Sequence, residues 1–355
     1  MSVTDGVVLR PVSSLGLNPK EITVAEILQK QGYATACIGK WHLGDQGPFL
    51  PTRQGFDYYF GIPYSDDMTA RKGKPWPPLP LMKNEKVIEA PVDRALLTKR
   101  YTEECVRFMK QNREKPFFLY LAHAMPGSTR KPFASDTFRG KSKNGAWGDS
   151  VEEIDWSTGQ LLKALKDLKI DSNTLVIWTS DNGAPRRRPP QGLNLPLSGW
   201  GYTTAEGGMR VPCLVRWPGR IRTGVVNREI RTTMDFLPTF AKLAGARPPQ
   251  DRVIDGKVWP LATGEEPSKP LYDAFYYFHM NELQAVRSGP WKLYLKTKKR
   301  EKAALFNLRD DLTEKKNVIA EKQQLARKIA EIAKKMKRRP VGKVKQPRPQ
   351  SLSRH

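Results

Sequence analysis

Apolar positions in the first 260 residues form short runs, and each run follows a stretch with helical spacing. The run at residues 33–38 follows a short segment, residues 23–32, that begins with a capping box and closes on a glycine. The run at 116–121 follows a helical pattern over about 96–112. Such alternation predicts a buried parallel sheet covered by helices.

The same alternation continues toward residue 262. A helical stripe over about 150–168 precedes a run at 174–179, interpreted as a third buried strand, and residues 211–217 predict a fourth strand. A helix is expected over 233–243, since Pro238 fits its first turn. The prediction is an α/β fold with a doubly wound, mostly parallel sheet.

Beyond residue 263 the pattern changes to short alternating segments, at 275–278, 284–287, 291–295 and 304–308. These predict a small antiparallel sheet, which a charged helix over about 317–337 closes. We therefore expect an α/β domain at 1–262, an antiparallel subdomain at 263–338, and a disordered basic tail at 339–355.

The chain is strongly basic: it contains 61 Lys and Arg residues and 36 Asp and Glu residues, which gives a formal net charge of +25. An anionic partner is expected, with nucleic acid, acidic glycan and phospholipid all open. No apolar stretch is long enough to cross a membrane, and the first 25 residues lack a signal-peptide core, which predicts a cytoplasmic chain as written. Cys37, Cys105 and Cys213 are interpreted as buried packing residues.

The sequence Gly39-Lys40-Trp41-His42-Leu43-Gly44 follows the first predicted strand. In an extended segment Lys40 and His42 share one face, and Trp41 points the other way into packing. An ammonium and an imidazole projecting together suit an anionic group such as a sulfate or phosphate ester. The alternative is a strand that ends in a polar turn.

Three further polar residues follow predicted strands, at the sheet edge where open α/β folds place their chemistry. His123 is either a ligand or acid, or a hydrogen-bonded core residue. Asp181 and Asn182 offer the oxygen ligands that calcium or magnesium prefers, although these residues alone favour an Asp-Asn-Gly turn. The run Arg186 to Arg188 is interpreted as a solvated loop.

Taken in order, seven motifs resemble those of the sulfatase family, most closely its arylsulfatase A-like branch. They are Gly39-Lys40-Trp41-His42-Leu43-Gly44, Gly55-Phe56-Asp57, Gly61-Ile62-Pro63-Tyr64-Ser65, Pro116-Phe117-Phe118-Leu119-Tyr120, Thr179-Ser180-Asp181-Asn182-Gly183, Glu206-Gly207-Gly208-Met209-Arg210-Val211-Pro212 and Ala285-Val286-Arg287. The resemblance implies an α/β domain of the alkaline phosphatase type with a small C-terminal antiparallel subdomain.

The resemblance also implies the chemistry of a sulfuric ester hydrolase acting on a sulfate ester or sulfated glycan. A cysteine or serine converted to formylglycine attacks sulfur, and calcium, or magnesium, balances the charge. On the matching positions, Lys40 and His42 would bind the formylglycine and sulfate oxygens, and Asp181 and Asn182 would ligate the metal. Cations and a metal at strand ends stabilise charge on ester oxygens, in agreement with the residues themselves.

Three departures from the family pattern stand out. The paired aspartates of the family's first strand and its Cys/Ser-x-Pro-x-Arg nucleophile segment have no counterpart, so formylglycine is absent and the metal site is incomplete. Gly127 replaces the family's histidine after His-x-x-Pro, and Gly201 replaces the lysine five residues before Glu206. We therefore expect a truncated, impaired and poorly soluble chain, since a missing strand exposes a sheet edge.

Three alternatives stay open. A noncatalytic protein holding sulfated polysaccharide or another polyanion in a basic cleft predicts salt-sensitive binding without turnover. Nucleic acid could bind through the tail at 339–355. A phosphatase or phosphodiesterase of the same superfamily is disfavoured, because the segments at 39–44 and 206–212 resemble sulfatase versions of their loops. The substrate's identity and the oligomeric state are left open by the sequence.

Overall fold

The computed structural model describes residues 8–127, 129–188, 191–261, 270–280, 282–298 and 300–337. Its main sheet has the order β4-β3-β2-β1-β5, with β1 parallel to both β2 and β5. The hairpin of β3 and β4 extends it antiparallel from β2. The strands are β1 (Ala34–Gly39), β2 (Tyr58–Gly61), β3 (Leu81–Lys83), β4 (Lys86–Glu89) and β5 (Phe117–Ala122).

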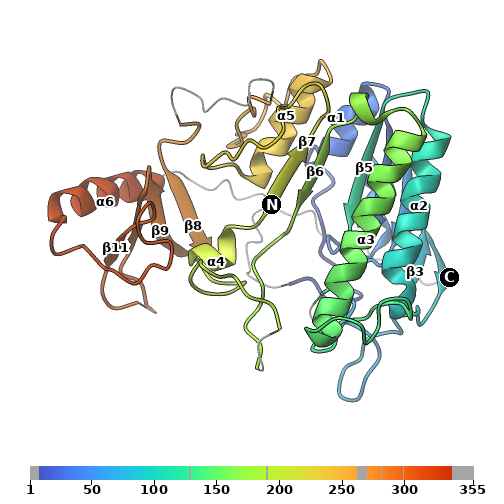
Figure 1. The fold of residues 1–355 in the computed structure, drawn as a ribbon, viewed down its shortest axis with the longest axis horizontal. Helices are drawn as coiled ribbons and strands as arrows, with labels where there is room; N and C mark the ends of the chain where they lie inside the picture. Colours follow the sequence, from blue (N-terminus) through green and yellow to red (C-terminus); the bar gives the residue numbers. More distant parts are fainter. Residues whose placement is uncertain are drawn as a thin grey trace.

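Helices cover both faces of this sheet, which confirms the doubly wound prediction. Ala36 and Ile38 of β1 pack toward α2, whereas Cys37 between them packs in a second cluster with Ala25 of α1. Figure 1 shows α2 and α3 side by side on one face, with α1 and α5 on the other. The helices are α1 (Val24–Lys30), α2 (Leu97–Gln111), α3 (Gly145–Asp167) and α5 (Phe236–Leu243).

Two predicted strands form a separate pair. β6 (Val176–Thr179) pairs antiparallel with β7 (Cys213–Arg216), and in the described chain β5 pairs only with β1. The strand predicted at 174–179 is confirmed at Val176–Thr179, but its predicted burial is wrong, since Trp178 is 36% exposed. An apolar run does not specify the strand that pairs with it. Because no ladder joins β5 to β6, Tyr120 of β5 stays 45% exposed. The prediction that Cys213 is a buried packing residue is also wrong, since Cys213 is exposed.

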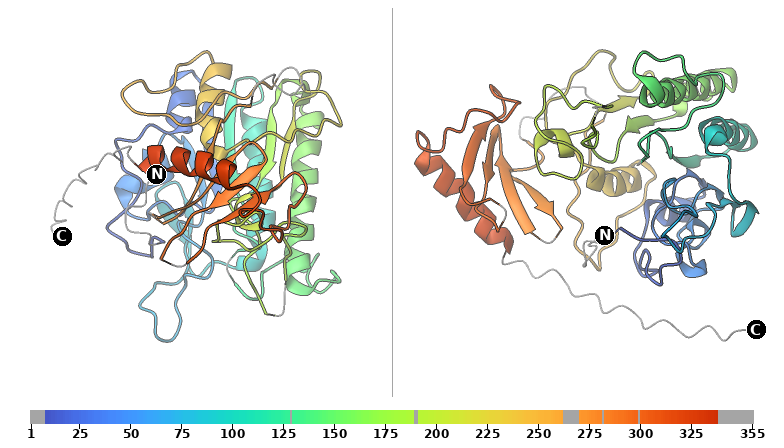
Figure 2. Two further views of the ribbon diagram at one scale, coloured as in Figure 1. Left: turned by 90° about the vertical axis from the view of Figure 1, so that its left-hand side faces the viewer. Right: turned by 90° about the horizontal axis from the view of Figure 1, so that it is seen from below.

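The C-terminal part is an antiparallel sheet of order β11-β10-β9-β8, as the alternating pattern predicts. Figure 2 shows α6 lying across the face of this sheet that is turned away from the α/β domain. The elements are β8 (Phe275–His279), β9 (Glu282–Ser288), β10 (Trp291–Tyr294), β11 (Ala304–Asn307) and α6 (Gln323–Lys337). The predicted boundary at 262 and the tail at 339–355 lie outside the described residues.

The last helix begins later than the sequence pattern predicts. At residues 317–322 the chain forms turns, because the Asn317 side chain accepts hydrogen bonds from the amides of Leu305 (3.0 Å) and Ile319 (3.1 Å). That side chain ties the segment to β11 instead of leaving it free to coil. Among the described helices, none is both long and apolar enough to cross a membrane.

Candidate active site

The Lys40–His42 turn begins where β1 ends, at Gly39. The amide of Lys40 donates to the carbonyl of Ala122 (2.7 Å), at the end of β5, and the amides of residues 41 and 42 donate to carbonyls of Ile62 and Pro63 (both 3.0 Å), after β2. A side chain at position 39 would clash, since its Cβ would lie 1.9 Å from the Ala122 oxygen. The turn is thus fixed at the carboxyl edge of the sheet.

Strand β1 ends at Gly39, so Lys40 and His42 lie beyond it, and a shared face for their side chains stays a prediction. His42 has φ +62°, a left-handed conformation that is costly without glycine. The amides of residues 40–42 donate to the last residue of β5 and to the segment after β2, and these hydrogen bonds hold the turn in place beyond the end of β1. Trp41 is buried, as predicted, and its indole N–H donates to the carbonyl of Phe49 (2.8 Å).

The imidazole of His42 has one nitrogen engaged. Nε2 lies 3.1 Å from the carbonyl oxygen of Leu9, an acceptor, so Nε2 carries the hydrogen. Burial lowers the pKa of His42, the bond to Leu9 opposes the shift, and the charge of Lys40 lowers the pKa further. A neutral ring with Nε2 protonated leaves Nδ1 as a proton acceptor beside the Lys40 ammonium.

His123 follows β5 and lies against the helices. Its Nε2 is 3.4 Å from the hydroxyl of Ser157 on α3, and its ring lies 6.4 Å from that of Tyr101 on α2. Burial lowers the pKa of His123 to about 4, and within the described chain its buried Nδ1 has no hydrogen-bond partner. The ring is therefore neutral at pH 7 and packs on the α2–α3 side.

The Asp181–Gly183 loop follows β6 and packs against α4 (Glu206–Met209). The Gly183 amide donates to the Gly208 carbonyl (3.1 Å), and a Cβ at position 183 would lie 1.7 Å from the Gly207 oxygen. Asp181 is exposed and faces β5: burial raises the pKa of Tyr120 to about 12, and the charge of Asp181 adds to the shift. The two glycine motifs are thus in backbone contact.

The predicted metal ligands form only part of a cation site. Asp181 contributes a carboxylate, and the amide nitrogen of Asn182 donates to the Gly183 carbonyl (2.9 Å), which leaves Oδ1 for a ligand. Calcium takes six to eight oxygen ligands. Over the described ranges, His, Cys, Asp and Glu side chains nowhere gather in a metal-binding group of three or more. The residues present do not complete a calcium or magnesium site.

Both unusual glycines are tightly enclosed. A Cβ at Gly127 would lie 2.4 Å from a carboxylate oxygen of Asp66, and Gly127 has φ +58°. A Cβ at Gly201 would lie 2.2 Å from the carbonyl oxygen of Gly183. In this conformation, neighbouring atoms occupy the space that a Cβ would need at these two positions, so neither the histidine nor the lysine of the family pattern fits there.

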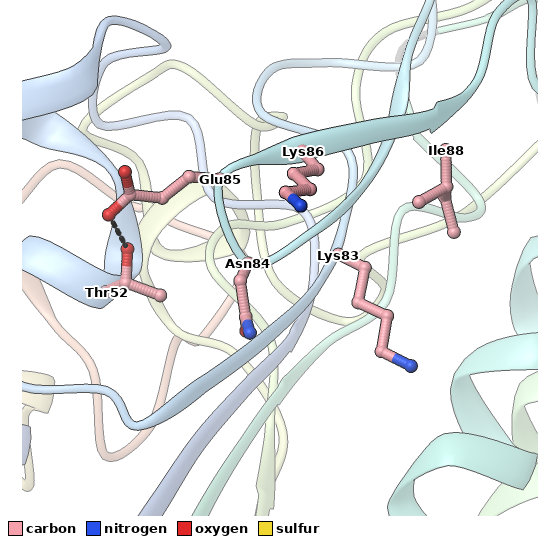
Figure 3. Close-up of a pocket in the computed structure, with 6 residues that line it drawn as sticks. All are labelled: Thr52, Lys83, Asn84, Glu85, Lys86 and Ile88. Atoms are coloured by element: carbon pink, nitrogen blue, oxygen red, sulfur yellow. Dashed lines mark hydrogen bonds between the residues drawn. The ribbon is translucent and has the colours of Figure 1, made fainter.

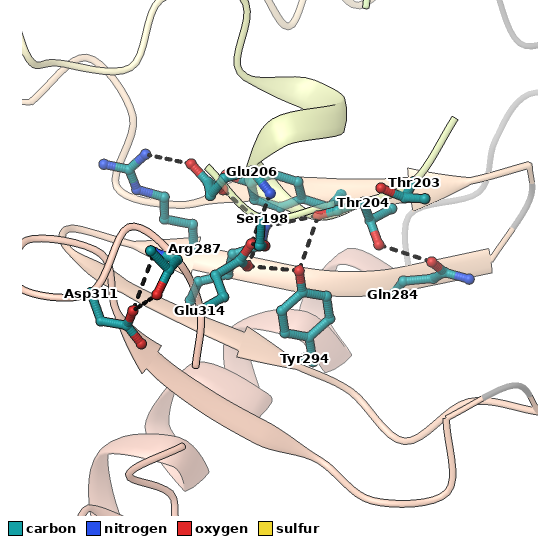
Figure 4. Close-up of polar contacts among 12 residues, drawn as sticks. Ser198, Thr203, Thr204, Glu206, Gln284, Arg287, Tyr294, Asp311 and Glu314 are labelled. Carbon is teal, nitrogen blue, oxygen red and sulfur yellow. Dashed lines mark hydrogen bonds and ion pairs between the residues drawn. The ribbon is translucent and has the colours of Figure 1, made fainter. Parts of the chain in front are cut away.

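A buried ionic cluster holds α4 against the C-terminal sheet (Figure 4). Lys292 of β10 is 0% exposed, and its Nζ lies 2.8 Å from Glu206 Oε1, 3.0 Å from Glu314 Oε1 and 2.8 Å from the Thr204 carbonyl oxygen. Burial acts to raise the pKa of Glu314, but the Lys292 charge and several hydrogen bonds lower it below its usual value.

Further contacts complete this Lys292 cluster. Tyr277 donates to Glu206 (3.0 Å), Tyr294 donates to Glu314 (2.7 Å), and the amide of Glu206 donates to Glu314 (2.9 Å). Sequence reasoning singled out Glu206 as part of a motif but missed Lys292 and Glu314. The cluster fixes α4, and α4 in turn contacts the loop that carries Asp181 and Asn182.

A shallow hollow beside the β3–β4 hairpin contains none of the predicted site residues (Figure 3). It is lined by Thr52, Lys83, Asn84, Glu85, Lys86 and Ile88. Thr52 and Arg53 both contact Glu85, so its carboxylate is already engaged. The candidate site is the carboxyl edge, not this hollow.

Comparison with known proteins decides the family. The family model described as Sulfatase matches residues 6–246, more than half of the chain. The chain belongs to the sulfatase family. A second model, N-sulphoglucosamine sulphohydrolase, C-terminal, matches residues 202–342. The predicted family and fold class are both confirmed.

Individual relatives agree. Mouse N-acetylgalactosamine-6-sulfatase is 38% identical over 298 residues, which cover 79% of this chain and 56% of the mouse protein. Bovine arylsulfatase A is 38% identical over 317 residues, which cover 82% of this chain and 61% of the bovine protein. This chain thus spans just over half the length of these curated relatives.

Solved structures show the same fold. The crystal structure of Ps i-CgsB has a TM-score of 0.80 and 28% identity, over 94% of this chain and 78% of that one. The PsFucS1 sulfatase from Pseudoalteromonas sp. has a TM-score of 0.81 at 24% identity, over 94% of this chain and 77% of that one. Most of this chain therefore has the same fold as these two structures.

Proposed function

We propose that the 355 residues include the sulfate-binding part of an arylsulfatase-type sulfuric ester hydrolase. The observation that carries the proposal is the Lys40–His42 turn, a family motif clamped by three backbone hydrogen bonds at the carboxyl edge of a sulfatase-fold sheet. Open α/β sheets bind their ligands at that edge. The turn presents a cation and a neutral imidazole there.

The two side chains have different roles in this proposal. The Lys40 ammonium binds a sulfate oxygen and balances the negative charge on the ester. The neutral imidazole of His42, oriented by the Leu9 carbonyl, accepts a proton from a hydroxyl through Nδ1. His123, neutral and turned toward α2 and α3, is at most a hydrogen-bonding neighbour of the substrate.

The family's cofactors are only partly represented. Formylglycine, where present, supplies the hydroxyl that attacks sulfur. The 355 residues contain no Cys/Ser-x-Pro-x-Arg sequence, so turnover by that chemistry requires a nucleophile from outside them. Asp181 and Asn182 would contribute two oxygen ligands to Ca²⁺ or Mg²⁺, and no step is assigned to a metal.

The substrate class we propose is a sulfate ester on a saccharide. One relative is named N-acetylgalactosamine-6-sulfatase, and two similar structures are titled as complexes with k-i-k-neocarrahexaose and with D-glucosamine-2-N,6-O-disulfate. A sulfated sugar has the charge that Lys40 complements. The basic composition of the chain favours such an anion over a neutral ester.

Binding of 4-nitrophenyl sulfate to the purified chain, measured by calorimetry, tests the proposal without requiring turnover. Lys40→Ala should weaken binding about tenfold, as expected for the loss of a charge-assisted contact. Lys328→Ala, on the exposed side of α6, is the control and should change the Kd less than twofold. Equal binding by Lys40→Ala and the unsubstituted chain contradicts the proposal.

A second candidate is a noncatalytic protein that binds sulfated glycan, and the net charge of +25 favours it. It predicts salt-sensitive binding of heparin that Lys40→Ala leaves unchanged. Nucleic-acid binding through 339–355 is tested separately, because deletion of that segment should abolish it. Binding that persists after the deletion excludes the tail as the nucleic-acid site.

A further inference from the structure

We propose that Arg10, Arg71, Lys74 and Trp76 form a second anion subsite beside the Lys40–His42 turn. Its ligand is an anionic group on a neighbouring sugar of a sulfated oligosaccharide, while the reacting sulfate lies at Lys40. This inference rests on the proposed function, because it names a longer, multiply charged substrate for the same site.

Three cations surround one indole ring. The Arg71 guanidinium carbon lies 5.0 Å from the Trp76 ring centroid, the Lys74 ammonium 5.4 Å and the Arg10 guanidinium carbon 5.7 Å. The ring itself is partly buried and packs against the main hydrophobic core, whereas all three cations are exposed. The arrangement is a fixed aromatic platform with a positively charged rim.

The loop that carries the cluster has defined geometry. Arg71 and Lys74 pair across a tight turn, in which the Lys74 amide donates to the Arg71 carbonyl (3.1 Å) and Gly73 has φ +76°. At the base of the loop the Leu79 amide donates to the Thr69 hydroxyl (3.1 Å). The two cations are therefore held on one turn.

Among the residues that the structure describes, no carboxylate pairs with these positive charges. In the described ranges none of Arg10, Arg71 and Lys74 forms an ion pair, although elsewhere arginines such as Arg100 and Arg216 do. Like charges around one ring repel one another, and only the ring's electron-rich face offsets this. An anion bound among them removes the repulsion and accepts charge-assisted hydrogen bonds from the guanidinium and ammonium groups.

The cluster is connected directly to the candidate active site. The Arg10 segment is attached to the turn on both sides, by the contact between His42 Nε2 and the Leu9 carbonyl (3.1 Å) and by the Val12 amide donating to Asp45 (2.7 Å). The Arg10 charge also lowers the pKa of His42. The Arg10 side of the Trp76 cluster therefore lies close enough to the His42 ring for its charge to act on that ring.

The topology places the cluster on the substrate side of the sheet. Its loop connects β2 to β3 and so leaves from the carboxyl end of β2, the edge at which the Lys40–His42 turn lies. Figure 1 shows this loop and the one after β6 beyond the same end of the sheet. An oligosaccharide lying across that edge would contact both Lys40 and Trp76.

The experiment compares two probes by calorimetry at one ionic strength: 4-nitrophenyl sulfate, with one anionic group, and a heparin hexasaccharide, with many. Arg71→Ala/Lys74→Ala should weaken the hexasaccharide about tenfold and change the monosulfate less than twofold. The matched control is Arg327→Ala/Lys328→Ala, which removes one arginine and one lysine from the exposed face of α6. Trp76→Phe should retain more affinity than Trp76→Ala.

The outcomes separate this subsite from the proposed function. Equal loss of hexasaccharide affinity in the two double variants overturns the subsite, since net charge alone then explains binding. Equal weakening of both probes by Arg71→Ala/Lys74→Ala overturns it as a second site. If Lys40→Ala affects neither probe while Arg71→Ala/Lys74→Ala still weakens the hexasaccharide, the Trp76 anion site stands and the sulfate ester site at Lys40 falls.

Discussion

The Lys292 cluster and the Trp76 cluster both place cations over aromatic rings, but they balance charge in opposite ways. Lys292 lies 4.2 Å from the Tyr277 ring centroid and 4.9 Å from that of Tyr294, and two carboxylates bind it. The cations around Trp76 are exposed and, among the described residues, have no carboxylate partner. A buried cation requires partners from its own chain, whereas an exposed one is available to a ligand.

This difference also separates stability from binding. The Lys292 cluster joins the C-terminal sheet to α4 and is satisfied on all sides, so its removal should affect folding. The cations of the Trp76 cluster repel one another in the free protein, so their removal should weaken ligand binding without lowering stability. The predictions below test that separation.

Lys292→Met should produce the largest effect, a loss of about 3–5 kcal/mol in the free energy of unfolding, because it removes the buried cation that contacts both Glu206 and Glu314 and leaves Glu206 only the longer contact with Arg287 (3.8 Å). Urea denaturation measures it. Lys328→Met, on an exposed position, should stay within about 0.5 kcal/mol. Adding Glu206→Gln and Glu314→Gln to Lys292→Met should recover part of the loss. A loss below about 1 kcal/mol for Lys292→Met shows that the buried charges are not interdependent.

His123 follows β5, at the same edge of the sheet as the Trp76 cluster. It tests whether burial of an ionisable side chain, without a charged partner, lowers the free energy of unfolding. Its folded-state pKa is about 4, below the unfolded value near 6.5, so the unfolded chain binds the proton more readily. Stability should therefore fall as pH decreases from about 6.5 to 4, by up to about 3 kcal/mol. His123→Asn should remove that part of the slope, measured by urea denaturation at several pH values. An unchanged slope means that His123 is solvated.

Gly201 lies in the loop between the Lys292 cluster and Asp181, and a substitution there tests how firmly the two are connected. Gly201→Lys restores the family residue, but its Cβ would meet the Gly183 carbonyl at 2.2 Å. We expect a loss of about 1–3 kcal/mol in thermal or urea unfolding, as for other overpacked sites. Gly47→Lys, where a Cβ meets no atom within 4 Å, is the matched control, because Gly47, like Gly201, has no positive φ. Equal losses would mean that the loop moves aside freely.

Arg71→Ala/Lys74→Ala should have the smallest effect on stability. Both residues are exposed and have no ion pair in the described structure, so the free energy of unfolding should change by less than about 0.5 kcal/mol. A slight gain is expected at low salt, where repulsion is least screened. A large loss would show that the Trp76 cluster is structural, which would place it with the Lys292 cluster.

Local patterns in the sequence account for most of the fold. The capping box at Thr23 and Glu26 is present, with both of its hydrogen bonds, and the apolar run after it forms β1. The motif at 39–44 indicated the site because its residues are adjacent in sequence. Its conformation was not predictable, since the carbonyls that bend residues 40–42 belong to the ends of other strands.

Contacts between distant segments were missed. Lys292 stands in an alternating strand and resembles an ordinary solvent-facing lysine, but Glu206, 86 positions away, covers it. Arg10 and Trp76 lie in segments without periodicity, so no pattern indicated that they meet. The pairing of β6 with β7 alone was likewise unpredictable, because an apolar run indicates a strand but does not specify its neighbours, and its burial depends on them.

The contact between Gly183 and the Gly207 carbonyl has a consequence for how this sequence can diverge. A Cβ at Gly183 would meet the Gly207 oxygen at 1.7 Å, and a Cβ at Gly207 would meet the Ser198 oxygen at 2.5 Å, so a substitution at either position meets a backbone atom rather than an adaptable side chain. Divergence of the Asp-Asn-Gly loop is therefore coupled to that of the Glu-Gly-Gly segment. Substitutions in the two segments are therefore expected to occur together, although 24 positions separate these glycines in the chain.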